Sequence, residues 1–129
     1  GHYYFPAYGV PYDDGLFAAA LMCQIASERD IAEEISEMPD YPVSPELRID
    51  CPESAKEALV EKVAEKYSEH ELSTVDGVKI YFDGGWALVR PSNTEPKMSV
   101  RCEADTEERL GEILEEVESS VRDFIKACS

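Results

Sequence analysis

Basic side chains are scarce in this sequence. Its 129 residues include 12 Lys and Arg against 28 Asp and Glu, which gives a formal net charge of -16 at pH 7. A nucleic acid or an anionic membrane surface would be repelled by so acidic a chain. We therefore expect neither a nucleic acid nor a membrane as its partner.

Long apolar runs are also lacking. The longest, residues 16–25 with one glutamine inside it, is about half of the roughly 20 residues that a membrane span requires. Asp13 and Asp14 stand before this run, where a secretory signal would carry positive charge. These features predict a soluble, cytoplasmic chain without a signal peptide.

Cysteine and histidine form no pattern that indicates a metal site or a disulfide framework. There is no C-x-x-C pair, and His2 and His70 stand far apart. We expect no metal or cofactor in this chain, and we expect reduced, mostly buried thiols. The four cysteines are Cys23, Cys51, Cys102 and Cys128.

Regular strand and helix patterns begin after residue 46. Alternating apolar residues and turn signals predict strands, and apolar residues repeating every three or four positions predict two amphipathic helices. Asp50 or Cys51 is the expected cap of the first helix, and Asp105–Glu108 has the character of a capping box before the second. The expected strands are residues 47–51, 71–75, 78–82, 86–90 and 98–104.

The resulting order, β-α-β-β-β-β-α, predicts an α+β two-layer sandwich. Two helices cover one face of an antiparallel sheet of four to five strands. This pattern predicts that residues 47–129 form one small domain, joined by a proline-rich linker at residues 39–46 to whatever precedes it.

Residues 1–38 look like the end of a different domain. Asp13 and Asp14 offer a cap for a helix over residues 15–37, and the first half of that helix is apolar on every side. Such a helix is normally buried among neighbours, which the first forty residues do not contain. If it lies uncovered, we expect self-association through residues 15–26.

Residues 90–101 are the most informative segment. They hold three of the 12 basic residues, Arg90, Lys97 and Arg101, and a single acid, Glu95. Arg90 ends one expected strand and Arg101 lies in the next, so a hairpin-like return brings both guanidinium groups to the same end of the sheet. Paired arginines bind phosphate through charge-assisted hydrogen bonds.

The residues between these arginines also suit an oxyanion. Ser92 and Thr94 offer hydroxyl groups, and Asn93 tolerates the left-handed conformation of a backbone anion nest. The candidate phosphate-binding residues are therefore Arg90, Ser92, Asn93, Thr94 and Arg101, with Lys97 added on charge alone. The alternative is a solvated turn whose arginines pair with surface carboxylates.

The motif Arg-Pro-Ser-Asn-Thr-Glu-Pro at residues 90–96 resembles the phosphate-binding loop in the C-terminal domain of the α-D-phosphohexomutases, the phosphoglucomutase and phosphomannomutase family. Gly1-His2, followed by Asp13-Asp14-Gly15, looks like the close of that family's third domain, an α/β domain that binds the sugar, although Gly-His also fits a tag remnant. By this resemblance, residues 1–38 are the C-terminal tail of the preceding sugar-binding domain. The resemblance implies interconversion of hexose 1- and 6-phosphates, with this loop clamping the phosphate that is not reacting. It also implies that His2 lies near the reacting sugar as a positioning or proton-transfer group.

Two motifs of the family are absent: the Ser-His-Asn-Pro segment of its nucleophile and the Asp-Gly-Asp-Gly-Asp metal loop. Asp13-Asp14-Gly15 and Asp83-Gly84-Gly85 are better explained as a helix cap and a hairpin turn. The resemblance thus implies a parent enzyme that uses Mg²⁺, with a phosphorylated hexose and the parent's other domains as partners of this chain. We expect no turnover by the chain alone. The alternatives are a phosphoglucosamine mutase fragment and a non-catalytic anion-binding or interaction module.

Overall fold

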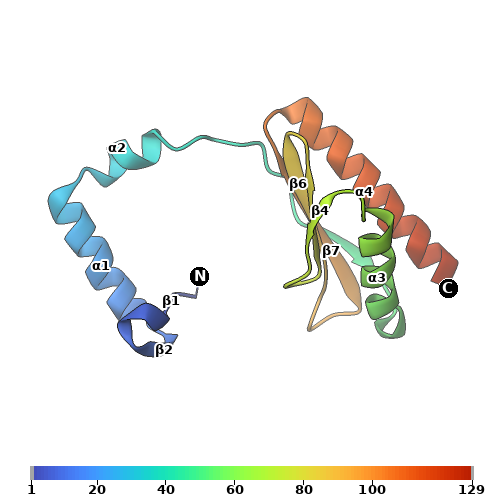
Figure 1. Cartoon of the computed structure of the whole chain (residues 1–129), viewed down its shortest axis with the longest axis horizontal. Coiled ribbons are helices and arrows are strands. Elements are labelled where there is room, and N and C mark those ends of the chain that lie inside the picture. The colour runs from blue at the N-terminus through green and yellow to red at the C-terminus, as the bar shows by residue number, and fades with distance from the viewer. Residues whose placement is uncertain (1, 129) are drawn as a thin grey trace. The chain divides into compact units, whose positions relative to one another are not determined.

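The computed structural model describes residues 2–128, apart from the side chains at positions 10, 11 and 128. The chain divides into two compact units, Gly1–Asp40 and Tyr41–Ser129. Figure 1 shows the elements of both units along the chain. None of the helices within residues 2–128 is long and apolar enough to cross a lipid bilayer.

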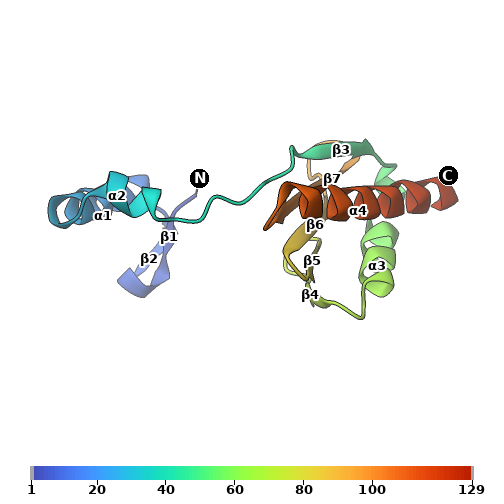
Figure 2. The same ribbon diagram turned by 90° about the horizontal axis from the view of Figure 1, so that it is seen from above.

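The second unit is a five-stranded antiparallel sheet with two helices on one face (Figures 1 and 2). The strand order across the sheet is β3-β7-β6-β5-β4. This architecture confirms the predicted element order and the predicted two-layer sandwich. The elements are β3 (Leu47–Asp50), the 3-10 turn η2 (Glu53–Ala55), α3 (Lys56–Lys66), β4 (Glu71–Ser73), β5 (Val78–Phe82), β6 (Gly85–Pro91), β7 (Lys97–Ala104) and α4 (Glu107–Cys128).

One edge of β7 is covered by residues that the sequence placed in a linker. β3 pairs with the first half of β7, and residues 42–44, inside the expected linker 39–46, continue along the second half. The Ser44 N–H donates to the Cys102 carbonyl at 2.9 Å, and the Cys102 N–H donates to the Ser44 hydroxyl, also at 2.9 Å. This part of the expected linker is therefore bound to the sheet.

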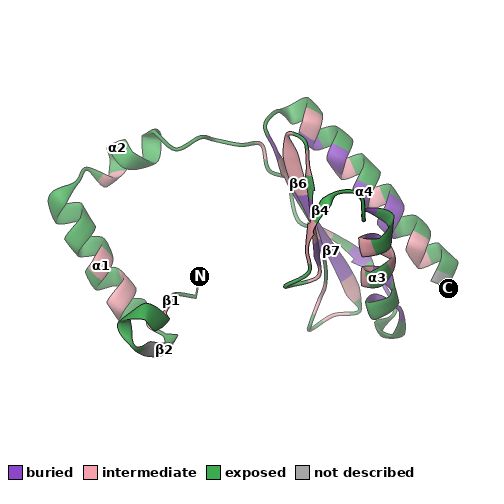
Figure 3. Ribbon diagram, in the orientation of Figure 1, coloured by how far each residue is buried: buried purple, intermediate pink, exposed green. Residues whose placement is uncertain are grey.

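Alternation along the strands sends one set of side chains into a core between the sheet and the helices (Figure 3). On β6, Ala87 and Val89 are fully buried, whereas Leu88 between them lies on the other face and is partly exposed. The apolar stripes that the sequence predicted for both helices supply the opposite side of this core. Its largest fully buried side chains are Leu59, Ile80, Met98, Ile113, Val63, Val78, Val89, Val100, Val117 and Val121.

The two helices of this unit begin differently. The expected cap at Asp50 or Cys51 is wrong, since no side chain caps η2 or α3. Asp50 still belongs to β3, so the chain first makes the η2 turn after Pro52 and only then enters α3. α4 begins as expected, because the Thr106 hydroxyl accepts a hydrogen bond from the Arg109 N–H at 3.1 Å.

The first unit holds a small sheet and two helices, and none of its described residues is buried. The predicted helix over residues 15–37 is interrupted: it ends before Arg29 and a second helix starts after Asp30. The Asp30 carboxylate accepts hydrogen bonds from the N–H groups of Ala32 and Glu33, a role in which aspartate starts a helix rather than continuing one. The elements are β1 (Tyr4–Phe5), η1 (Pro6–Tyr8), β2 (Val10–Asp13), α1 (Gly15–Glu28) and α2 (Ile31–Ser36).

The start of α1 matches the sequence prediction. Asp14 Oδ1 accepts a hydrogen bond from the Phe17 N–H at 2.8 Å. The apolar character of the helix leaves large side chains in solvent, since Leu16 is 86% and Met22 54% exposed. Apolar residues around a whole helix normally pack against other elements, so α1 has surface to offer a partner.

Alkaline conditions are expected to destabilise the second unit through the buried thiol of Cys102. Burial raises the pKa of this thiol from 9.0 to about 11. Between these values the unfolded chain loses the thiol proton while the folded chain keeps it, so the free energy of unfolding falls as the pH rises. A shift of this size corresponds to about 3 kcal/mol lost by pH 11.

Denaturant unfolding between pH 7 and pH 11 measures this loss. Burial also raises the pKa of the Tyr67 hydroxyl, which acts in the same direction. Cys102→Ala should therefore decline less steeply than the unaltered chain without becoming independent of pH. Equal slopes for the two proteins would show that the thiol is not responsible. The other described cysteines differ in environment, since Cys51 is buried and Cys23 is exposed.

Candidate functional site

β6 and β7 bring Arg90 and Ser99 together at one end of the sheet. Both lie on the face opposite the helices, because their neighbours Val89 and Val100 are buried in the core. The two residues are paired across the ladder, and Arg90 Nε donates to Ser99 Oγ at 3.4 Å. At this end residues 92–96, the site loop, leave β6 and return as β7.

The hydroxyl of Ser92 organises the site loop. Ser92 Oγ accepts hydrogen bonds from the N–H groups of Thr94 and Glu95, at 3.4 and 3.2 Å. The sequence predicted a left-handed Asn93 and an anion nest. This prediction is wrong, because no non-glycine residue of the described chain has a positive φ. The serine oxygen satisfies N–H groups that a nest would leave for a ligand.

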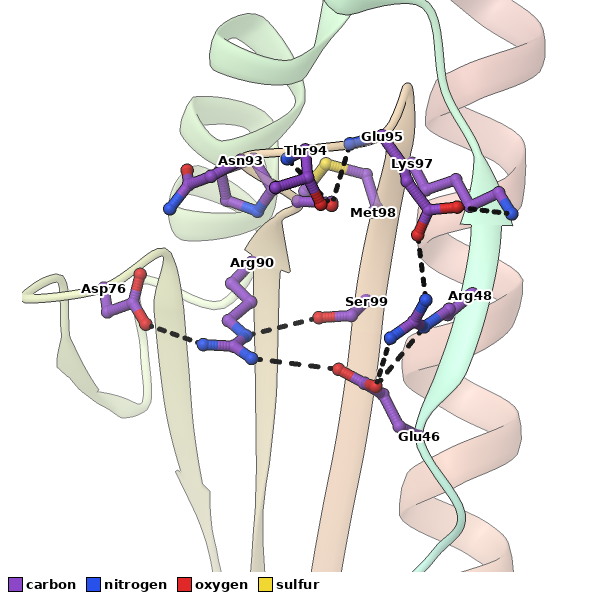
Figure 4. A pocket seen from close by; sticks show the side chains of 12 residues that line it. Glu46, Arg48, Asp76, Arg90, Asn93, Thr94, Glu95, Lys97, Met98 and Ser99 are labelled. Atoms are coloured by element: carbon purple, nitrogen blue, oxygen red, sulfur yellow. Dashed lines mark hydrogen bonds and ion pairs between the residues drawn. The ribbon is translucent and has the colours of Figure 1, made fainter. Parts of the chain in front are cut away.

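A pocket of about 220 Å³ lies beside the site loop (Figure 4). It is smaller than the roughly 300–1,000 Å³ of sites for drug-sized ligands, so it suits a small ion or one end of a larger ligand. Most of the candidate binding residues line it, namely Arg90, Ser92, Asn93, Thr94 and Lys97. The other lining residues are Glu46, Arg48, Asp76, Pro91, Glu95, Met98 and Ser99.

Arg101 does not line this pocket. In the β6–β7 ladder Arg101 pairs with Leu88, two residues along each strand from the pairing of Arg90 with Ser99. Alternate residues of a strand share one face at a spacing of about 6–7 Å, so Arg101 lies farther along the face that carries Arg90. The second arginine of the pocket is instead Arg48, which β3 contributes from the other side of β7.

Carboxylates face every cation of the pocket, as the dashed lines of Figure 4 show. The sequence indicated an excess of positive charge within residues 90–101, but Glu46 and Asp76 come from elsewhere in the chain and balance it. The pocket is therefore lined by three basic and three acidic residues. The pairs and their N–O distances are Arg90–Asp76 at 3.1 Å, Arg90–Glu46 at 3.8 Å, Arg48–Glu95 at 2.8 Å, Arg48–Glu46 at 3.3 Å and Lys97–Glu95 at 3.4 Å.

These ion pairs are weak because solvent reaches them. The side chains of Arg90 and Asp76 are 46% and 66% exposed. Pairs this exposed typically contribute about 0–1 kcal/mol each, whereas a hydrogen bond to a charged group contributes about 1.5–3 kcal/mol. A doubly charged anion that makes several such bonds can therefore displace the carboxylates.

Sequence reasoning missed Arg48, Glu46 and Asp76 as residues of this site. Arg48 carried a signal, because it alternates with Leu47 and Ile49 in an expected strand and so faces away from the core. The sequence did not indicate that this strand pairs with β7. That pairing brings together segments that lie far apart along the chain, and local patterns carry no information on it.

His2 belongs to the first unit, where its Nδ1 lies 2.7 Å from Asp13 Oδ2 and both side chains are exposed. The pocket beside the site loop is lined by residues of the second unit. Among residues 2–128, no three His, Cys, Asp or Glu side chains gather in a way that could hold a metal ion. Asp14 caps α1, and Gly84, with φ of 75°, forms the turn between β5 and β6, as the sequence predicted.

The sheet and its two helices define the second unit as a two-layer α+β domain, with a charged pocket beside the site loop. Residues 46–120 match the family model of the phosphoglucomutase/phosphomannomutase C-terminal domain. The chain belongs to this family, which confirms the resemblance seen in the motif at residues 90–96.

Individual relatives agree with this assignment. The phosphomannomutase/phosphoglucomutase of Pseudomonas aeruginosa is 36% identical over 131 residues, which cover 98% of this chain and 27% of that protein. A probable phosphoglucosamine mutase of Methanopyrus kandleri is 39% identical over 113 residues, covering 84% of this chain and 25% of that protein.

A solved structure extends the similarity to three dimensions. The crystal structure of a phosphoglucomutase/phosphomannomutase family protein from Burkholderia thailandensis has a TM-score of 0.79 and 26% sequence identity to this chain. The similarity covers 96% of this chain and 27% of that one. This chain thus spans about a quarter of the length of the relatives it matches.

Proposed function

We propose that this chain is the C-terminal part of a phosphohexomutase that interconverts the 1- and 6-phosphates of glucose or mannose. Its site loop and Arg90 clamp the phosphate that is not reacting. The observation that carries this proposal is the pocket of about 220 Å³, because the residues of the family-like motif surround it.

The clamp works by exchanging anions. Arg90 releases Asp76 and Glu46 and binds phosphate oxygens in their place, through charge-assisted bonds that a planar guanidinium makes in pairs. Arg48 and Lys97 add positive charge from the other side of the pocket. Ser92, Asn93 and Thr94 add neutral donors, and Arg101 strengthens the positive field from farther along the same face.

The chemical step belongs to a longer parent protein in this proposal. The described residues offer no group that could hold Mg²⁺, so no step here is assigned to that ion. The proposed partners are the phosphorylated hexose and the parent's other domains, and the proposed role of His2 is to position the sugar or transfer a proton. The chain by itself is expected to lack mutase turnover.

A glucosamine phosphate is the alternative substrate. Relatives in Methanopyrus kandleri and Pyrococcus abyssi, 39% and 36% identical to this chain, are both described as probable phosphoglucosamine mutases. Because the clamp holds a phosphate rather than the sugar, the second unit should bind both kinds of substrate.

Titration of the chain with glucose 1-phosphate, followed by amide chemical shifts, tests the clamp. We expect shifts confined to residues 90–99 and to Glu46, Arg48 and Asp76, since these surround the pocket. Sodium chloride at equal ionic strength separates site binding from screening, and glucosamine 6-phosphate tests the alternative. A response spread evenly over the surface would favour a solvated turn. Light scattering at the same concentrations detects the proposed self-association through residues 15–26.

A further inference from the structure

Lys56 is a charged side chain buried beneath the site loop. It is the first residue of α3, and only 5% of its surface is exposed. Lysine is almost never buried to this degree unless its charge and its donors are satisfied. Lys56 Nζ donates to the carbonyl oxygens of Ser92 and Glu95 at 2.6 and 2.7 Å and pairs with Glu53 Oε2 at 2.7 Å. These three partners match the three donors of an ammonium group.

The two carbonyls lie on either side of the loop tip, so one ammonium group holds both ends of the turn. Ser92 precedes and Glu95 follows the two residues at the tip of the site loop, Asn93 and Thr94. The peptide bonds are trans, so a Ser92 carbonyl held toward Lys56 turns the Asn93 N–H to the opposite side. The hydrogen bonds of Lys56 therefore fix the position of the tip relative to the core.

The anchor of these bonds is rigid. Lys56 opens a helix whose next inward-facing residues, Leu59 and Val63, are fully buried. The returning end of the loop is also held from outside, because the Cys51 N–H donates to the Pro96 carbonyl at 2.9 Å. Two further hydrogen bonds lie within the turn and its flanking residues: the Ser92 N–H donates to the Lys97 carbonyl at 2.9 Å, and the Lys97 N–H donates to the Glu95 carbonyl at 2.8 Å. Those bonds shape the turn, whereas the Lys56 bonds fasten it to α3.

We infer that Lys56 is a positioning residue, which holds the site loop in its binding conformation without touching the ligand. Lys56 does not line the pocket of about 220 Å³, so its effect on that pocket passes through the loop backbone. With Ser92 and Asn93 it lines a separate hollow instead. This inference rests on the proposed phosphate clamp. If the ordered turn is populated only in part without Lys56, the apparent affinity for a phosphosugar falls by that fraction.

The experiment compares Lys56→Met with the unaltered chain, using glucose 1-phosphate as the probe and amide hydrogen exchange as a second readout. Methionine keeps most of the buried volume and removes all three donors. We expect the dissociation constant to rise roughly tenfold and exchange at the Ser92 and Lys97 amides to accelerate by a similar factor.

Two controls separate positioning from general stability. Val63→Ala weakens the same helix in its core without touching the site loop, so it should lower the unfolding midpoint and leave the affinity unchanged. Lys126→Met removes the same charge from an exposed position on α4 and should change neither. If Val63→Ala weakens binding as much as Lys56→Met does, or if Lys56→Met binds normally, the inference is overturned.

Two further outcomes remain decisive. If no variant binds the probe, the clamp proposal fails, and the exchange rates alone decide whether Lys56 orders the loop; unchanged rates reject the inference. If Lys56→Met does not fold, Lys56→Arg takes its place. A guanidinium group has a different donor geometry from an ammonium group, so exchange should accelerate and the dissociation constant should rise roughly threefold. Values equal to those of the unaltered chain would again reject the inference.

Discussion

Arg90→Ala is expected to weaken phosphosugar binding by roughly 30- to 700-fold, which corresponds to about 2–4 kcal/mol. The reason is that Arg90 is the cation at the centre of the pocket, where its guanidinium approaches Asp76, Glu46 and Ser99 and can offer paired donors to a phosphate. Calorimetric titration of the proposed parent enzyme with glucose 1-phosphate measures the loss.

The same substitution should barely change the free energy of unfolding. Arg90 is 46% exposed and its ion pairs are of the weak, solvent-reached kind. Arg122→Ala is the matched control, because Arg122 is 51% exposed and also pairs with a glutamate, yet lies on α4 outside the pocket. If Arg90→Ala lowers stability as much as affinity, Arg90 is a structural residue and the clamp assignment is wrong.

Replacing Asp76, which pairs with Arg90, is expected to have the opposite effect on binding in the same titration. Asp76→Asn removes the negative charge that a phosphate must displace while keeping the shape of the side chain. Because an exposed pair contributes at most about 1 kcal/mol, binding should tighten by roughly two- to fivefold. Weaker binding in this variant would mean that Asp76 orients Arg90 rather than competing for it.

Gly77→Ala is expected to destabilise the second unit by roughly 2–5 kcal/mol. Gly77 has φ of +74°, and a Cβ added there would lie 2.3 Å from the Val89 carbonyl oxygen and 2.7 Å from Arg90 Cα. Both are backbone atoms of β6, the central strand of the sheet, so they cannot move aside cheaply. The total free energy of unfolding of a single domain is about 5–15 kcal/mol, so the midpoint of thermal unfolding should fall by many degrees.

Gly84→Ala separates backbone strain from steric conflict. Gly84 has nearly the same φ, +75°, but the nearest atoms to an added Cβ are side-chain atoms of Asp105 and Arg109 at 3.5 and 3.6 Å. The free energy of unfolding of this variant should fall by only roughly 1–2 kcal/mol, the cost of placing an alanine in the left-handed conformation. Equal losses at both positions would show that contact with β6 is not what makes Gly77 necessary.

Part of the site could be predicted from its own residues. Arg90, Ser92, Asn93, Thr94 and Lys97 all line the pocket, because a short loop between paired strands brings sequence neighbours together wherever it lies. The predicted conformation of Asn93 was wrong, since the Ser92 hydroxyl satisfies the loop N–H groups in another way. Lys56 could not be found, because nothing in the helix pattern shows which carbonyls lie beneath its first residue.

By itself the sequence determined the helices, the strands, most of the turns and the apolar faces, because each depends on residues within a few positions of one another. Only the tertiary structure decided the charge and the shape of the pocket. The register of β6 and β7 places Arg101 outside the pocket, and the pairing of β3 with β7 places Arg48 inside it. Glu46 and Asp76 pair with Arg90 and balance its charge. These outcomes depend on contacts between distant segments, which no local pattern encodes.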